Sequence, residues 1–93
     1  MDIIKKFEEA AIKHSNMLLF TSVQTLEIIE DCRKMGTRIY GIDGFKISGK
    51  WIQPIGEHSV DFSYIQNEHA LYDMAKTFVE ERMNLELVFE IVI

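Results

Sequence analysis

Apolar residues recur at every third or fourth position in three stretches of the chain, and this spacing predicts three helices. The first covers about residues 2–14, with Asp2 as a candidate N-cap. The second covers about residues 22–35, and the third covers about residues 67–83. Residues 15–21 interrupt the pattern with an apolar centre, and we interpret them as a connection that tucks under the fold.

The ends of the second and third helices carry capping signals. Thr21 and Gln24 have the spacing of a capping box, in which side chains and backbone of the first turn bind each other reciprocally. Gly36 stands where a glycine in the left-handed conformation commonly ends a helix. Two residues compete as N-cap of the third helix, because both Ser63 and Asn67 have a suitable side chain.

After Gly36 the period shortens to two, which predicts strands. We expect a largely buried strand over about residues 37–43, a hairpin over about 45–53 and a short half-buried strand over 59–63. Pro54 is expected to end the hairpin, because proline has no N–H to donate to a neighbouring strand. The residues that follow it are interpreted as a turn.

The last stretch, residues 85–93, is apolar on both faces toward its end, which is typical of a strand inside a sheet. The predicted order is ααββββαβ. Three helices collected on one face of a mainly antiparallel sheet of about four to five strands predict an α+β, two-layer fold. Residues 1–93 form a single domain in this interpretation, and the second face of the sheet is left to water or to a partner.

The formal net charge of −5 is unevenly distributed. Residues 1–42 hold six basic and six acidic side chains, whereas residues 43–93 hold four basic and nine acidic ones. This sign argues against direct binding to nucleic acid, because phosphate contacts require Lys and Arg. Two explanations of the acidic excess stay open, namely solubility and electrostatic steering toward a basic protein partner.

Cys32 is the single cysteine, so neither an intramolecular disulfide nor a cysteine zinc cluster can form within the chain. We interpret it as a buried apolar residue of the second helix. The first residues are charged and amphipathic and lack the apolar core of a signal peptide. No apolar run approaches the roughly 20 residues that span a bilayer. We therefore expect a cytoplasmic protein.

Candidate catalytic and metal-binding groups are sparse. None of the spacings of a metal site occurs among the three histidines, His14, His58 and His69. Glu57, His58 and Asp61 are weighed as metal ligands, but a solvated polar turn is favoured. Asp43 and Asp61 are weighed as an acid–base pair, with an ordinary turn favoured for the Asp-Gly step. We expect no cofactor, no metal and no enzymatic activity.

Aromatic and acidic residues occur together in the middle of the chain, which is a plausible composition for a surface that binds a basic, groove-bearing protein. The candidate partner-binding residues are Asp43, Trp51, Glu57, His58, Asp61 and Tyr64. Tyr40 lies in the same region. For Trp51 a second interpretation stays open, in which its side chain packs on the open side of the hairpin.

The residues around this region resemble a known family. A helix that ends in Lys-Met-Gly is followed by RIYGIDGFKI, then by WIQP and then by EHSVDFS. The arrangement is similar to small bacterial immunity proteins, the cytoplasmic antidotes encoded beside colicins and polymorphic toxins. It is similar to immunity proteins that guard against tRNA-cleaving colicins, and it also looks like a broader immunity family in polymorphic toxin loci. The resemblance covers residues 22–63, and the last helix and strand match by arrangement alone.

The resemblance implies a toxin inhibitor rather than an enzyme. Such a protein binds one cognate toxin, here a basic protein with a nuclease domain as one candidate, and occludes its active site with an acidic surface. Asp43, Glu57 and Asp61 would contact toxin Lys or Arg, and Trp51 and Tyr64 would be anchors. We expect a monomer or a weak homodimer.

The sequence departs from the tRNase-guarding pattern after Asp43, with a longer hairpin, its own EHSVDFS and an extra N-terminal helix. The chemistry of the toxin therefore stays open. Two alternative functions are kept beside the inhibitor. One is a generic interaction domain or homodimeric scaffold that uses the open sheet face, and the other is a small metal-dependent hydrolase.

Overall fold

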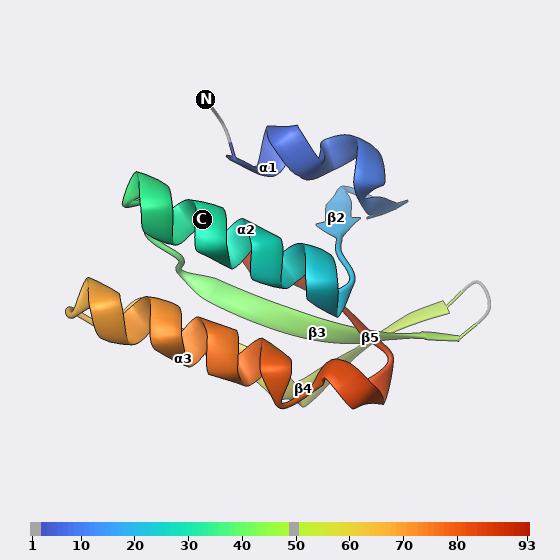
Figure 1. The fold of residues 1–93 in the computed structure, drawn as a ribbon. Coiled ribbons are helices and arrows are strands. Elements are labelled where there is room, and N and C mark those ends of the chain that lie inside the picture. The colour runs from blue at the N-terminus through green and yellow to red at the C-terminus, as the bar shows by residue number, and fades with distance from the viewer. Residues whose placement is uncertain (1–2, 49–50) are drawn as a thin grey trace.

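A computed structural model describes residues 3–48 and 51–93 of the chain, the side chains of residues 54 and 55 excepted. Figure 1 shows two long helices side by side across a sheet, with the N-terminal helix next to one of them. The helices are α1 (Ile3–Phe7), α2 (Ser22–Met35) and α3 (Glu68–Glu80), with the 3-10 turns η1 (Glu8–Ala10) and η2 (Met83–Leu85). The strands are β1 (Ile12–His14), β2 (Met17–Leu19), β3 (Gly41–Ser48), β4 (Trp51–Asp61) and β5 (Leu87–Val92).

The fold is α+β and mainly antiparallel, as the sequence predicts. Strands β4, β3 and β5 form an antiparallel sheet in that order, and α2 and α3 cover one of its faces (Figure 1). Strands β1 and β2 form a second sheet. The three helices keep their predicted sequence order, whereas the four strands expected between the second and third helices merge into the two longer strands β3 and β4.

The first helix and the connection after it are shorter than predicted. Helix α1 ends at Phe7, the 3-10 turn η1 follows it, and the β1–β2 hairpin then occupies residues 12–19. This hairpin brings Leu19 and Phe20, which are buried, to the main sheet. Burial of these two side chains is a tertiary contribution that outweighs the local helical spacing. The candidate cap Asp2 lies outside the described residues.

Strand β4 is longer than predicted and continues through Pro54, where the sequence predicts an end. The proline is tolerated because β4 is an edge strand of the main sheet, where one side of the backbone has no neighbouring strand. The sequence also predicts a break at the Asp-Gly step. This break does not occur, because β3 runs without interruption from Gly41 to Ser48. The prediction that residues 37–40 belong to this strand is wrong, because the strand begins at Gly41.

Strand β4 bulges opposite a glycine of β3. The pairing register shifts between Asp43 and Phe45, so that Gly44 alone faces residues 55–58, the segment predicted as a turn. A Cβ atom on Gly44 would lie 2.8 Å from the carbonyl oxygen of His58, which is closer than such atoms pack. Glycine at this position therefore permits the close approach of the bulged strand.

Both long helices begin at side-chain caps. Thr21 and Gln24 form the predicted capping box, and Gly36 ends α2 with a left-handed φ of 68°. Of the two candidates for α3, Asn67 is the cap and Ser63 is not. The Asn67 side chain accepts a hydrogen bond of 3.2 Å from a backbone N–H of the first turn. The caps explain why candidate start positions of these helices can be recognised in the sequence.

Strand β5 lies at the end of the three-stranded sheet, whereas its composition predicts an interior strand. Two contacts explain its apolar character on both faces. Phe20 bridges the free side of β5 through two hydrogen bonds of 2.8 Å with Phe89. On the helix face, Phe89 and Ile91 join the main core, while Val88 joins a small cluster on the opposite face.

The main hydrophobic core fills the space between the helices and the sheet. Cys32 is fully buried there, as predicted, and burial raises the pKa of its thiol to about 11. This thiol is therefore protonated at neutral pH and unsuited to nucleophilic chemistry. Among the described residues no helix combines the length and apolarity needed to cross a membrane.

Candidate functional site

The sheet face turned away from the helices has an apolar end and an acidic end. The apolar end is a small buried cluster of Leu19, Phe45 and Val88. At the acidic end, Asp43 of β3 pairs with Ser59 of β4 on one side and with Glu90 of β5 on the other. Directly paired residues of antiparallel strands point to the same face, so Asp43 and Glu90 are neighbours there.

Asp43 and Glu90 place two carboxyl groups side by side in a partly buried environment. Burial, and after it the negative charge of Asp43, raises the pKa of Glu90 above its ordinary value. The folded protein thus holds these carboxylates at an electrostatic cost. A cation supplied by a partner would relieve that cost.

Asp61 extends the acidic end along β4. It lies two residues beyond Ser59 and therefore on the same face, and its side chain is exposed. Its carboxylate accepts the backbone N–H of Ser63 at 2.8 Å, and hydrogen bonds from Ser63 hold the pKa of Asp61 below its ordinary value. A shallow hollow of about 200 Å³ is bordered by Tyr40, Asp43 and Asp61.

The exposed aromatic residues lie at opposite ends of β4. Tyr40 and Tyr64 flank the end at Asp61, and their side chains are 48% and 70% exposed. Trp51 is 79% exposed at the start of the strand, so it does not pack on the hairpin. Trp51 pairs with Ser48 and Asp61 with Gly41, and these β3 partners are seven residues apart, so at roughly 3.3 Å per residue Trp51 lies about 23 Å from Asp61. The structure therefore brings Tyr64 to the acidic end and places Trp51 apart from it.

Arg38 holds the segment that follows β4. One terminal nitrogen of its guanidinium lies 3.0, 3.0 and 2.6 Å from the carbonyl oxygens of Phe62, Ser63 and Ile65. The same guanidinium lies 5.6 Å from the ring centre of Tyr40. Arg38 thus fixes the backbone on both sides of Tyr64 and orders this end of the site.

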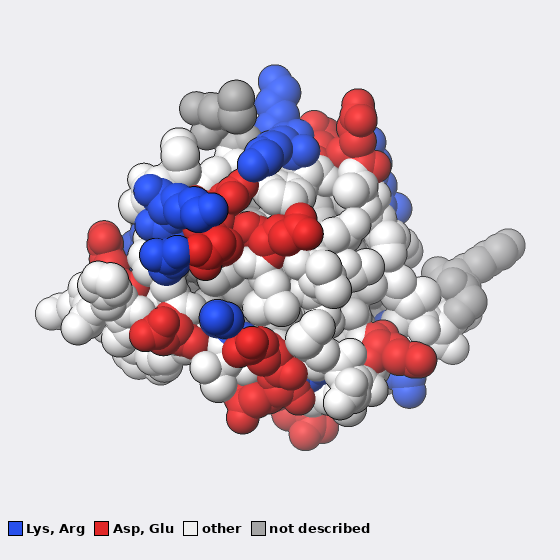
Figure 2. All heavy atoms as spheres, viewed as in Figure 1, with Lys and Arg blue, Asp and Glu red and all other residues white. Residues whose placement is uncertain are grey.

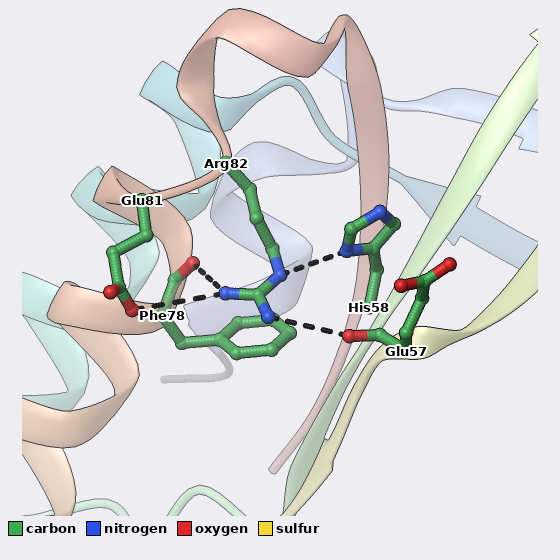
Figure 3. Close-up of polar contacts among 5 residues, drawn as sticks. All are labelled: Glu57, His58, Phe78, Glu81 and Arg82. Carbon is green, nitrogen blue, oxygen red and sulfur yellow. Dashed lines mark hydrogen bonds and ion pairs between the residues drawn. The ribbon is translucent and has the colours of Figure 1, made fainter.

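Arg82 holds the bulge of β4 in a similar way (Figure 3). Its Nε donates to Nδ1 of His58 at 3.1 Å, and its terminal nitrogens donate to the carbonyl oxygens of Phe78 and Glu57 at 3.0 and 3.3 Å. The guanidinium carbon also lies 3.9 Å from the ring centre of Phe78. His58 is therefore engaged within the fold, and Glu57 contributes its backbone oxygen rather than its carboxylate to this contact.

The carboxylates of the acidic end are not ion-paired. The ion pairs among the described residues join Lys6 to Asp31, Arg33 to Glu30 and Arg82 to Glu81. None of them involves Asp43, Glu57, Asp61 or Glu90. Arg38 donates to backbone carbonyls, and Arg82 donates to backbone carbonyls and pairs with Glu81, so neither neutralises the carboxylates of the acidic end.

The arrangement offers little for metal binding or catalysis. No group of three or more His, Cys, Asp or Glu side chains in the described part of the chain could hold a metal ion. Nδ1 of His58, one of the groups weighed as a ligand, already accepts from Arg82. Asp43 and Asp61 share a face but lie on an open surface, with no enclosed cleft between them.

Sequence reasoning missed Arg38, Arg82 and Glu90. The two arginines count as ordinary surface charges in the sequence, and nothing local marks them as ligands of distant carbonyl groups. Glu90 did carry a signal, because the two-residue period of the last strand places it on the face opposite the apolar positions. Its proximity to Asp43 required the β3–β5 register.

Comparison of the chain with protein-family models, with curated proteins and with solved structures found no match.

Proposed function

We propose that this protein is an immunity-type inhibitor that binds a basic bacterial toxin, with a nuclease domain as the leading candidate, through the acidic end of its open sheet face. The observation that carries the proposal is the pair of carboxylates at Asp43 and Asp61. They lie on one open face, without ion-pair partners, and exposed tyrosines flank them. An acidic surface of this kind occupies the groove in which a nuclease would hold phosphates.

The electrostatics favour a cationic partner. Charge-assisted hydrogen bonds between carboxylates and Lys or Arg are stronger than neutral ones, and they also set orientation. Complementary fields raise the association rate toward roughly 10⁸ M⁻¹ s⁻¹ at low salt. Tyr40 and Tyr64 add apolar contact area with a hydroxyl at the edge, which is typical of residues that dominate binding energy.

Preorganisation also supports the proposal. Arg38 fixes the backbone around Tyr64 before any partner arrives, so less conformational entropy is lost on binding. A homodimer through the same face is disfavoured, because it would bring Asp43, Asp61 and Glu90 of one copy against the same acids of the other. The inhibitor and not the scaffold is therefore our first choice.

The test is calorimetric titration against the purified product of the adjacent gene at two salt concentrations. We expect nanomolar binding that weakens as salt rises. The double variant D43N/D61N should weaken binding by about 100-fold, since each lost charge pair is worth on the order of 1.5 kcal/mol. Asparagine at position 61 keeps an oxygen that can accept the Ser63 N–H, so the fold should be retained.

A matched control removes the same number of charges elsewhere. E8Q/E9Q changes two exposed glutamates in η1, on a different part of the molecule. It should leave the affinity within about threefold of the wild type, because it alters only long-range attraction. Equal losses in the two double variants, or no binding at tens of micromolar, would argue against the acidic end as the inhibitory surface.

A further inference from the structure

A groove separates α3 from β4 on the helix face of the molecule. Its volume is about 380 Å³, and Val60, Phe62, Met74 and Phe78 are its apolar lining residues. Phe62 and Phe78 are buried, whereas Met74 is 40% exposed. The groove therefore offers an apolar surface directly beside the edge strand of the main sheet.

Acidic side chains border the groove. Asp73 and Glu81 both line it and are both exposed. Figure 2 shows that Asp and Glu predominate over α3, whereas Lys and Arg gather over α1 and the C-terminal part of α2. Arg82, the cation in the groove lining, contacts Phe78, His58 and backbone carbonyls and forms a loose ion pair of 3.9 Å with Glu81, whereas Asp73 has no such pair among the described residues. An apolar surface with an acidic border fits a side chain with an aliphatic stem and a cationic head.

The edge of β4 beside this groove is open over a short window. Phe62 donates its N–H to the carbonyl of Tyr40, so in an alternating ladder Val60 and Phe62 direct their backbone toward β3. Ser59 and Asp61 consequently direct theirs away from the sheet.

The window is limited on both sides. Arg82 donates to the carbonyl of Glu57 on one side, and β4 ends at Asp61 on the other. Beyond Glu57, the bulge and Pro54 also hinder the pairing of a further strand with this edge. The window Ser59–Asp61 is the part of this edge where none of these features hinders pairing.

We propose that the window Ser59–Asp61 of β4 accepts an extended, basic segment of the partner protein as an added strand. A Lys or Arg of that segment enters the groove, with its stem over Met74 and Phe78 and its charge at Asp73 or Glu81. Main-chain hydrogen bonds supply affinity in this mode, and alternate side chains supply specificity. Side chains of the other parity reach the sheet face that carries Asp61. The inference rests on the proposed function for the identity of the segment, which would belong to the toxin.

Charge selects this occupant over a second copy of the chain. Pairing of two β4 edges would place Asp61 and the two acids of the groove close to their counterparts, and like charges across an interface cost several kcal/mol. A basic segment meets the same acids with opposite charge. The groove and the acidic end of the sheet also share β4, so one partner can contact both.

The probe is an acetylated and amidated heptapeptide of alternating threonine and lysine, Thr-Lys-Thr-Lys-Thr-Lys-Thr, titrated into the ¹⁵N-labelled full chain. We expect amide shift changes at Ser59 and Asp61 and along the groove side of α3, with a Kd between roughly 0.1 and 3 mM at low salt. Amide exchange at Ser59 and Asp61 should slow on saturation. The same peptide with every backbone nitrogen methylated is the matched control, and it should bind at least about tenfold more weakly because it has no N–H to donate to a strand on either edge.

Two double variants distinguish binding of the peptide in the groove from general electrostatic attraction to the acidic protein. D73N/E81Q should weaken the unmodified peptide by about fivefold or more, whereas E8Q/E9Q should change it less than twofold. Each of four results would overturn the inference: no shifts at about 5 mM peptide, shifts confined to the face of Asp43 and Glu90, equal binding of the methylated peptide, or the same shifts caused by self-association. If any of these results is obtained while D43N/D61N still weakens toxin binding by about 100-fold, the proposed function stands and this inference fails.

Discussion

The arginine of α2 and the arginines around β4 have different structural roles. Arg33 on α2 pairs with the carboxylate of Glu30 one turn away, and both side chains remain nearly half exposed. Arg38 and Arg82 donate mainly to backbone carbonyls 24 to 27 residues away in sequence, and Arg82 also donates to Phe78 one turn back and lies 3.9 Å from Glu81. The first arrangement neutralises a surface acid and contributes little stability. The second fixes the shape of the strand that carries the candidate site.

This difference explains why the acidic end stays available. A cation engaged by several carbonyl oxygens is positioned by them, and it has less freedom to pair with a nearby carboxylate. Asp43 and Asp61 therefore remain without ion-pair partners although arginines lie nearby. The fold orders the site with its arginines while leaving its negative charge in place.

The largest expected effect is at the bulge of β4. In G44A the added Cβ would meet the carbonyl oxygen and the Cβ of His58 at 2.8 and 2.9 Å, so β4 must shift. We expect a loss of about 3 kcal/mol in the free energy of unfolding, measured by urea denaturation. G56A is the matched control within the same bulge, because a Cβ at Gly56 meets nothing within 4 Å. Equal stability of the two variants would contradict the close approach described here.

The next effect distinguishes the two kinds of arginine directly. R38A removes three hydrogen bonds to carbonyl groups, and we expect a loss of about 2–3 kcal/mol in the free energy of unfolding. R33A removes an exposed ion pair on α2 and should cost far less than R38A, because solvent screens that pair. Similar losses in the two variants would show that contacts to carbonyl groups have no special weight in this fold.

A smaller loss in the free energy of unfolding is expected at Arg82, where a lysine variant serves as a chemical control. R82A should cost about 1–2 kcal/mol, because the guanidinium stacks on Phe78 and binds His58 and two carbonyls. R82K keeps the charge but lacks the planar fork, so we expect it to recover less than half of that loss. Full recovery by lysine in thermal unfolding would mean that charge alone matters at this position.

The smallest expected effect is the change in the free energy of unfolding with pH. Its sign differs between Glu90 at the acidic end and Glu30 on α2. The folded-state pKa of Glu90 is raised, so stability falls as pH rises from below the ordinary value of 4.5 through the raised pKa. E90Q should therefore be slightly more stable than the wild type at pH 7, with the difference disappearing below about pH 4.

Glu30 on α2 should behave in the opposite way. Its hydrogen bond and ion pair with Arg33 lower its folded-state pKa, so this contribution is present above the ordinary pKa and is lost as pH falls through the lowered one. E30Q should consequently be slightly less stable than the wild type at pH 7. Unfolding curves at pH 4, 5.5 and 7 for both variants check the signs, and a shared sign would refute the contrast.

The sequence by itself determined the α+β class, the two long helices and the start of the first of them, and it narrowed the N-cap of the other to Ser63 or Asn67. Thr21, Gln24, Gly36 and Asn67 act within a few residues of their own positions, so their roles can be inferred locally. It also showed that the negative charge lies in the second part of the chain. These properties depend on short-range spacing or on composition, and a single sequence displays both.

Only the tertiary structure decided how the strands divide and which polar residues meet. Helical spacing gave way to the β1–β2 hairpin because Leu19 and Phe20 gain burial against the sheet. The pairing of Asp43 with Glu90 depends on the β3–β5 register, and the contacts of Arg38 cross 24 to 27 residues. Such contacts form only when segments distant in the sequence come together. The residues that meet there are not specified by the spacing of neighbouring residues, so the sequence alone does not reveal them.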